Sequence, residues 1–271
     1  MAVVRSSHAI RSRPPRNLAA VLVGLFVTAV LGLSAVLNSV FLDRMAGIAS
    51  VGGLGAVLLV ALGSWLFVRR AHDPAIHRRH RAQAVILVGA AVFLWLAVVD
   101  VFLFTARAGP TVAVISALAC LPTTAFGLWA VRRLDRNEKE PWRLVLVAAA
   151  WGAVVSTSLV VWGETAWETL SVRWLVPGPG LAASTAYAAG IDEEIAKGIA
   201  VLLLYLVMRD EFDDVVDGIV YGAAVGLGFN FMESISYMTH LYVVFAPDGA
   251  GAAAVQWYAR QVLGLFFGHA T

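Results

Sequence analysis

Carboxylate side chains interrupt two apolar stretches in the second half of this chain. The first stretch carries the adjacent Glu193 and Glu194, followed by Lys197, and the second carries Glu233 within the sequence GLGFNFMES. Both stretches are otherwise apolar enough to cross a lipid bilayer, where an ionisable side chain is costly and usually functional. These carboxylates are therefore the first candidates for chemistry, and the remaining sequence is the scaffold that must position them.

Helical spacing predicts which of these side chains share a face. Glu194 and Lys197 are three residues apart and share one, whereas Glu193 is rotated from Glu194 by about 100°. We expect this group to lie about 10–15 Å from the external end of its helix. In the second stretch, Asn230 and Glu233 continue a face that begins with small residues at every fourth position, Gly218, Gly222 and Gly226. Small residues allow membrane helices to approach closely, so we expect this glycine stripe to pack against a neighbouring helix.

The two carboxylate-bearing stretches and a later histidine, His269, could activate water in two ways. A partly desolvated carboxylate can act as a general base on water. Alternatively, carboxylates and imidazole suit a divalent metal such as zinc, and the candidate ligands are then Glu193, Glu194, Glu233 and His269. Both arrangements support hydrolysis, and the spacing leaves open whether the protein uses a metal or no cofactor.

The composition predicts a multi-pass membrane protein. Of the 271 residues, 60% are hydrophobic and only 14% are charged, whereas soluble domains are about one quarter charged. Apolar segments long enough to cross a hydrocarbon core of about 30 Å recur along the chain. They predict an all-α, polytopic protein with about eight transmembrane helices, near 18–40, 48–68, 82–104, 111–131, 144–163, 187–208, 215–242 and from 252 onward. We expect the first segment to be a retained anchor, because it is longer than the apolar part of a typical signal peptide.

Basic residues predict the orientation in the membrane. They are concentrated before residue 18 and in the loops at 69–81 and 132–143, whereas the alternate loops hold few. The positive-inside rule therefore places both termini in the cytoplasm. Within the second basic loop, we expect the turn Glu138-Lys139-Glu140-Pro141 to be solvated. Tryptophans near 162–174 and the run Pro177-Gly178-Pro179-Gly180 predict an interfacial segment and an external loop over 164–186.

From about residue 130 onward, several motifs occur together and in order. They are RLDRNEKEP at 133–141, EEIAK at 193–197 and DGIVYGAAVGLGF at 217–229, followed by Glu233 and His269. In these motifs the chain resembles the PrsW family of intramembrane proteases, which is related to the CAAX prenyl proteases and bacteriocin-processing proteins. The resemblance implies a CAAX-protease-like helical core in the C-terminal half of the chain.

The resemblance also implies roles for individual residues. Glu193 and Glu194 would be the catalytic pair, Lys197 would support them, and Glu233 and His269 would complete the site. Asn230, one turn before Glu233, could help to stabilise the oxyanion. The chain then divides into a basic cytoplasmic N-terminus (1–17), N-terminal transmembrane helices with cytoplasmic loops (18–143) and a PrsW-like catalytic membrane core (144–271).

The function implied by the resemblance is site-1-type proteolysis in a bacterial inner membrane. The substrate would be a single-span, anti-sigma-factor-like protein in the lipid bilayer, cleaved near the external face by glutamate-activated water. Buried carboxylates also serve proton- or cation-coupled transporters, and a non-enzymatic membrane adaptor is a third class. No inverted repeat is visible and the first four segments hold few ionisable residues, which favours the protease. No nucleic-acid-binding signature occurs in the sequence.

Overall fold

The computed structural model describes residues 44–70, 74–134, 139–174, 179–207, 212 and 214–269. Among these residues the chain is helical apart from turns and short connections, and no strand occurs. The helices are α2 (Arg44–Arg69), α3 (Pro74–Ala108), α4 (Pro110–Leu134), α5 (Trp142–Trp151), α6 (Thr157–Trp174), α7 (Pro179–Val207), α8 (Val215–Val244) and α9 (Gly249–Trp257). The π-helix η1 (Gly152–Ser156) joins α5 to α6, and a second π-helix, η3 (Tyr258–Leu263), continues α9. The prediction of an all-α protein is confirmed for the residues that the structure describes.

Five segments among the described residues are long and apolar enough to cross a membrane. They are Val51–Arg69, Leu87–Ala108, Pro110–Leu134, Trp142–Val161 and Val215–Val244. These segments correspond to five of the predicted spans and confirm a multi-pass membrane protein. The expected anchor at 18–40 lies outside the described residues. Helix α7 is 29 residues long but carries four charged side chains, and α9 is only 9 residues long, so a total of eight spans stays a prediction.

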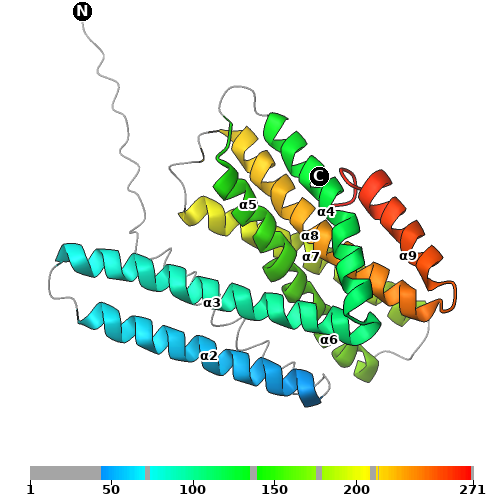
Figure 1. Ribbon diagram of the computed structural model, residues 1–271, viewed down its shortest axis with the longest axis horizontal. Helices are drawn as coiled ribbons and strands as arrows, with labels where there is room; N and C mark the ends of the chain where they lie inside the picture. Colours follow the sequence, from blue (N-terminus) through cyan, green and yellow to red (C-terminus); the bar gives the residue numbers. More distant parts are fainter. Residues whose placement is uncertain are drawn as a thin grey trace, which may run out of the picture.

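Helix α8 is the centre of the bundle. It packs against α3, α4, α5, α6, α7 and α9, whereas α2 and α3 lie side by side as an antiparallel pair along one edge (Figure 1). Helix α3 connects this pair to the bundle through contacts with α4 and α8. Because α7 also packs against α8, the two helices that carry the candidate carboxylates are direct neighbours.

Two aspartates define the start of α8. The Asp214 carboxylate accepts hydrogen bonds from the backbone amides of Val216 (2.6 Å) and Asp217 (3.3 Å). In return, the Asp217 carboxylate accepts one from the amide of Asp214 at 3.0 Å. This reciprocal capping box satisfies amides that the first helical turn leaves free. Since each helical residue turns by about 100°, fixing the first residue also fixes the direction in which Asn230 and Glu233 project.

Helix α8 touches the α5–η1 segment backbone to backbone at two glycines. A β-carbon added to Gly152 would lie 2.0 Å from the carbonyl oxygen of Val225, and one added to Gly228 would lie 1.8 Å from that of Ala149. Neither position has room for a side chain. By contrast, a β-carbon added to Gly218 would meet nothing within 4 Å. The predicted packing of the glycine stripe is therefore wrong at Gly218, and the closest helix contact uses a different glycine of α8.

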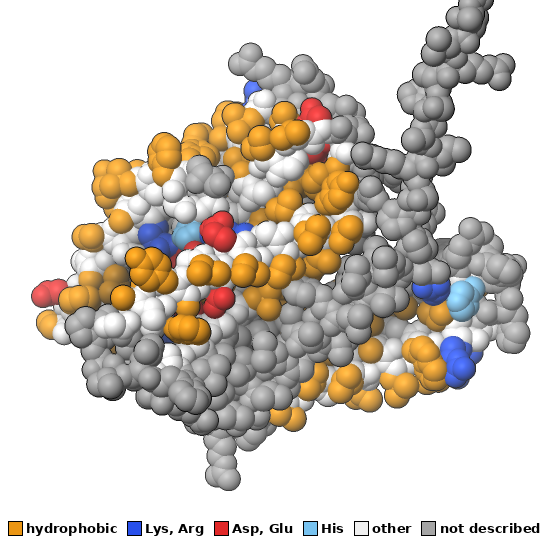
Figure 2. Space-filling model, turned by 180° about the vertical axis from the view of Figure 1, so that it is seen from behind, with side chains coloured by type: hydrophobic (Ala, Val, Ile, Leu, Met, Phe, Trp, Pro, Cys, Tyr) orange, Lys and Arg blue, Asp and Glu red, His pale blue; other side chains and the backbone are white. Residues whose placement is uncertain are grey.

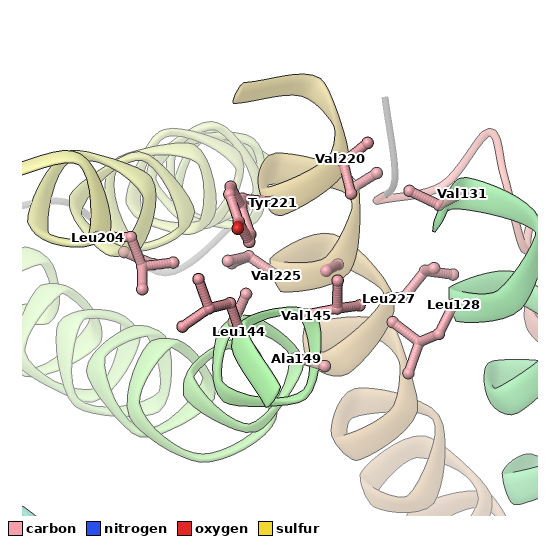
Figure 3. Close-up of a cluster of buried hydrophobic side chains, with 14 of the residues drawn as sticks. Leu128, Val131, Leu144, Val145, Ala149, Leu204, Val220, Tyr221, Val225 and Leu227 are labelled. Atoms are coloured by element: carbon pink, nitrogen blue, oxygen red, sulfur yellow. The ribbon is translucent and has the colours of Figure 1, made fainter. Parts of the chain in front are cut away.

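A cluster of buried apolar side chains joins α4, α5, α7 and α8 (Figure 3). Inside a membrane, close packing rather than removal of apolar surface from water stabilises such a cluster. The side chains that meet there include Leu128 and Val131 of α4, Leu144, Val145 and Ala149 of α5, Leu204 of α7, and Val220, Tyr221, Val225 and Leu227 of α8. The cluster holds α7 and α8 at a fixed separation on one side of the candidate carboxylates.

Glu140 is buried at the edge of this cluster. Only 6% of the residue is exposed, and its carboxylate accepts a hydrogen bond from the Tyr221 hydroxyl. The Arg132 side chain donates through Nε to the backbone carbonyl of Glu140 at 2.5 Å and covers the Trp142 ring. The prediction of a solvated turn is therefore wrong for Glu140, which connects the end of α4 and the start of α5 to α8.

The segment 164–186 is mostly helix. Helix α6 continues to Trp174 and α7 begins at Pro179, so the predicted external loop is wrong for these residues, while 175–178 lies outside the described residues. Proline is favourable at the first position of a helix, where its missing amide hydrogen would have no partner. Because α7 begins earlier than predicted, Glu193 lies at the midpoint of Pro179–Val207, about 21 Å from either end rather than 10–15 Å from one.

Candidate active site

Three side chains that are far apart in sequence converge between α7, α8 and the segment after η3. Glu193, Glu233 and His269 each offer one ligand atom, and these atoms lie within 4.8 Å of one another. The imidazole of His269 lies between the two carboxylates, with Nδ1 3.3 Å from Glu193 Oε2 and Nε2 2.9 Å from Glu233 Oε2. The structure thus brings together three of the four residues predicted to be catalytic.

Lys197 supplies positive charge on the α7 side of this group. Its Nζ lies 3.4 Å from Glu193 Oε2, 2.8 Å from Glu194 Oε1 and 3.0 Å from His269 Nδ1. It also lies 4.8 Å from the centre of the Phe229 ring, and the residue is buried. The contact with Glu194 is the one that the three-residue spacing predicted, and Lys197 joins Glu194 to the converging residues.

The two adjacent glutamates have different surroundings. The Glu193 side chain is 18% exposed and faces His269, whereas the Glu194 side chain is 76% exposed and contacts Lys197. Glu194 is not part of the group whose ligand atoms converge. Because adjacent residues of a helix point about 100° apart, only one of the pair can face α8 directly. The structure therefore separates the pair into an enclosed and an accessible carboxylate.

Arg260 of η3 is a site residue to which the sequence analysis assigned no role. Its guanidinium donates to Glu233 Oε2 and lies 2.8 Å from His269 Nε2. The guanidinium carbon also lies 4.9 Å from the centre of the Tyr237 ring. The signal available in the sequence was a cation within the apolar run that precedes His269, the same kind of signal that identified Glu233.

Asn230 is close to these residues but does not join the three converging ligand atoms. The residue is 2% exposed, and its Nδ2 donates to the backbone carbonyl of Arg260 at 3.5 Å. The next residue of η3, Gln261, donates to the Ser234 hydroxyl at 2.9 Å. Asn230 and Ser234 therefore hold η3 against α8. Asn230 contacts the backbone of Arg260, so it supports the site by positioning that residue.

The charged group opens onto an otherwise apolar face. Figure 2 shows basic, acidic and histidine side chains side by side in the middle of a surface covered by hydrophobic side chains. The exposed residues of α7 near Glu194 are also apolar, and they include Tyr187, Ile191 and Ile195. Charged side chains at such a position are expensive in a membrane, which is typical of a functional site rather than of simple packing.

The converging residues fit a divalent metal. Two carboxylates and one imidazole are suitable donors for zinc, and three protein ligands leave a fourth position for water, as in catalytic zinc sites. The same carboxylates contact Lys197 and Arg260, so their charge is also balanced by side chains of the protein. The geometry is thus compatible with a metal site and with a charge network that activates water without a metal.

The fold and the site together define a polytopic helical membrane protein with a carboxylate–imidazole centre between α7, α8 and the segment after η3. The family model for the PrsW family intramembrane metalloproteases matches residues 140–271, just under half of the chain, and this region holds every site residue described above. In this region the chain matches the PrsW family, which confirms the resemblance seen in the sequence motifs.

A curated relative agrees with this assignment. Protease PrsW of Geobacillus kaustophilus (strain HTA426) is 31% identical over 108 residues, which are 38% of this chain and 43% of the relative. The chain therefore spans less than half the length of this relative. No solved structure matches the chain.

Proposed function

We propose that this protein is a membrane-embedded peptidase that hydrolyses a peptide bond of a membrane-anchored protein. The observation that carries this proposal is the convergence of Glu193, Glu233 and His269 from three separate parts of the chain. Carboxylates and an imidazole at one point can bind water and transfer its proton. Membership of residues 140–271 in a family of intramembrane metalloproteases favours hydrolysis over proton or cation transport.

The two glutamates of α7 have different parts in the activation of water. Glu194 is exposed, so its carboxylate can receive a proton from a water molecule that arrives with the substrate. Glu193 is enclosed and faces His269 Nδ1 at 3.3 Å, so it can take part in the transfer of that proton between the water and the imidazole. Lys197 contacts both glutamates and keeps the accessible carboxylate next to the enclosed one. In this scheme Glu193 and Glu194 form the catalytic pair, and Lys197 is their support.

A divalent metal such as zinc is the cofactor that these residues suit best. Glu193, Glu233 and His269 would hold it, and the chemistry supplied there would be Lewis-acid polarisation of the scissile carbonyl. If the protein works without a metal, the same residues serve a glutamate mechanism. Glu193 or Glu194 is then the general base, and His269, with Asn230 as support, stabilises the oxyanion.

The substrate that fits this site is a single-span membrane protein of the anti-sigma-factor type, in a bacterial cell membrane. It would approach laterally along the exposed apolar face of α7, where Ile191 and Ile195 flank Glu194. Glu233 is 11 residues from Val244 and 18 from Val215, so it lies nearer the C-terminal end of α8. With both termini in the cytoplasm, that end is external, which supports cleavage in the outer half of the membrane.

The test uses purified protein in proteoliposomes with a tagged single-span reporter. We expect the wild type to cut the reporter and Glu233→Gln and His269→Asn to leave it intact. Asp248→Asn, an exposed carboxylate outside the site, should cut like the wild type. A reporter that stays intact with the wild type, together with a cation flux that both site variants abolish, would contradict the peptidase and indicate a transporter.

The metal is tested separately on the same preparation. A chelator such as 1,10-phenanthroline should stop cleavage, and added zinc should restore it, while elemental analysis should find one metal per chain. Full activity after chelation, with less than a tenth of a metal per chain, would instead assign the reaction to glutamate-activated water.

A further inference from the structure

A buried amide, that of Gln261, connects the π-helix η3 to two helices of the bundle. Gln261 is 1% exposed; its Oε1 accepts a hydrogen bond from Thr123 Oγ1 of α4 at 2.6 Å, and its Nε2 donates to Ser234 Oγ of α8 at 2.9 Å. A π-helix is rare and is often found at functional sites. These bonds fix the backbone next to Arg260, whose carbonyl oxygen Asn230 also contacts.

The Arg260 side chain also has fixed contacts, with Glu233 and Tyr237. It is 19% exposed, and its guanidinium stacks on Tyr237 while it donates to the Glu233 carboxylate. The same nitrogen that contacts Glu233 lies 2.8 Å from Nε2 of His269. One guanidinium therefore contacts a carboxylate of α8 and the imidazole of the segment after η3.

The two converging carboxylates each have their own cation. Lys197 contacts Glu193 on the Nδ1 side of His269, and Arg260 contacts Glu233 on the Nε2 side. Two carboxylates that face one imidazole repel each other, so a fixed positive charge beside each of them stabilises this arrangement. A guanidinium provides it at Glu233 with donors in a rigid planar fork, which an ammonium group does not have.

We propose that Arg260 is a positioning residue that holds Glu233 against His269 in the productive arrangement. It acts through Glu233 and not on the reacting atoms. The inference rests on the proposed peptidase function, because it assigns Arg260 a part in that same site. Groups that orient the functional carboxylates and imidazoles of such sites typically contribute about 10–100-fold to metal affinity or activity.

Kinetics on the single-span reporter distinguish positioning from substrate binding. We expect Arg260→Gln to lower kcat about 10–100-fold with KM within about twofold of the wild type. Arg260→Lys, which keeps the charge but not the fork, should recover part of kcat. Arg107→Gln changes an exposed arginine of α3 outside the site and should behave like the wild type. A raised KM with unchanged kcat would overturn the inference, because Arg260 would then bind substrate, and wild-type kinetics in Arg260→Gln would overturn it too.

A second measurement does not depend on peptidase activity. Thermal unfolding in detergent is compared for the wild type, Arg260→Gln, Glu233→Gln and the double variant. Each single change leaves one partly buried charge without its partner, so we expect the double variant to lose less Tm than the two single losses combined. Additive losses would show that Arg260 does not act through Glu233. If the wild type cuts no reporter but the Tm losses are coupled, the peptidase proposal fails while the Arg260–Glu233 link stands.

Discussion

Replacing Glu193 by glutamine is the most informative single change in the site. The amide has nearly the same shape as the carboxylate but lacks the negative charge that faces Lys197 at 3.4 Å and His269 Nδ1 at 3.3 Å. Lys197 keeps Glu194 as a partner at 2.8 Å, so the substitution does not leave the buried lysine without a carboxylate. We therefore expect the variant to insert and fold normally, with Tm close to that of the wild type.

The expected loss of activity is large by comparison. A carboxylate that acts in proton transfer is worth about 10²–10⁴ in rate, which corresponds to about 3–5 kcal/mol of transition-state stabilisation. If Glu193 serves only as a counter-charge, Lys197 still has Glu194 as a partner, and the loss is about 1 kcal/mol or less, roughly fivefold. The two roles therefore predict activities that differ by more than an order of magnitude.

The assay measures the initial rate of reporter cleavage in proteoliposomes at equal protein content. Asp248→Asn, which makes the same chemical change at an exposed position, is the matched control. A Glu193→Gln variant with normal Tm and a rate within fivefold of the wild type would refute the assignment of Glu193 to the chemical step.

Three further changes test the scaffold and the charge balance of the site. Gly228→Ala places a β-carbon 1.8 Å from a backbone oxygen of the neighbouring helix and should cost about 1–3 kcal/mol or more in stability. Gly218→Ala, whose β-carbon would meet nothing within 4 Å, should be neutral or slightly stabilising. Equal Tm values for the two variants would contradict the packing described. Tyr221→Phe removes the hydroxyl that donates to buried Glu140 and should lower stability by about 1–3 kcal/mol, measured by thermal unfolding; an unchanged Tm would show that this bond contributes nothing. Lys197→Met should reduce reporter cleavage about 10–100-fold, and Lys197→Arg should recover part of that loss. Full activity in the methionine variant would show that the reaction does not need the positive charge of Lys197.

The sequence was sufficient to predict the helical membrane scaffold and the residues that converge. Composition and segment length alone predicted the membrane helices, because both depend only on local properties of the chain. The meeting of Glu193, Glu233 and His269 is different, since helical periodicity places residues on faces and not beside each other. That part of the prediction depended on the family motifs.

What the sequence could not show depends on contacts between distant residues. The turn at Glu140 looked solvated because its partner, Tyr221, is 81 residues away. Arg260 received no role because its partner Glu233 is 27 residues away in the chain, and spacing along one helix does not show that the two side chains meet. The Pro/Gly run at 177–180 was read as a loop over 164–186, yet Pro179 is the first residue of a long helix.

The order in which the site residues occur in the chain also has a consequence during synthesis. Glu193 and Glu233 are translated before His269, and the 36 residues from Ser234 through His269 take about 2–7 s at ordinary elongation rates. Until His269 has left the ribosome, the nascent chain presents two carboxylates without the imidazole that joins them. A chain released after α8 but before His269 is therefore expected to insert most of its helices and yet lack a complete site.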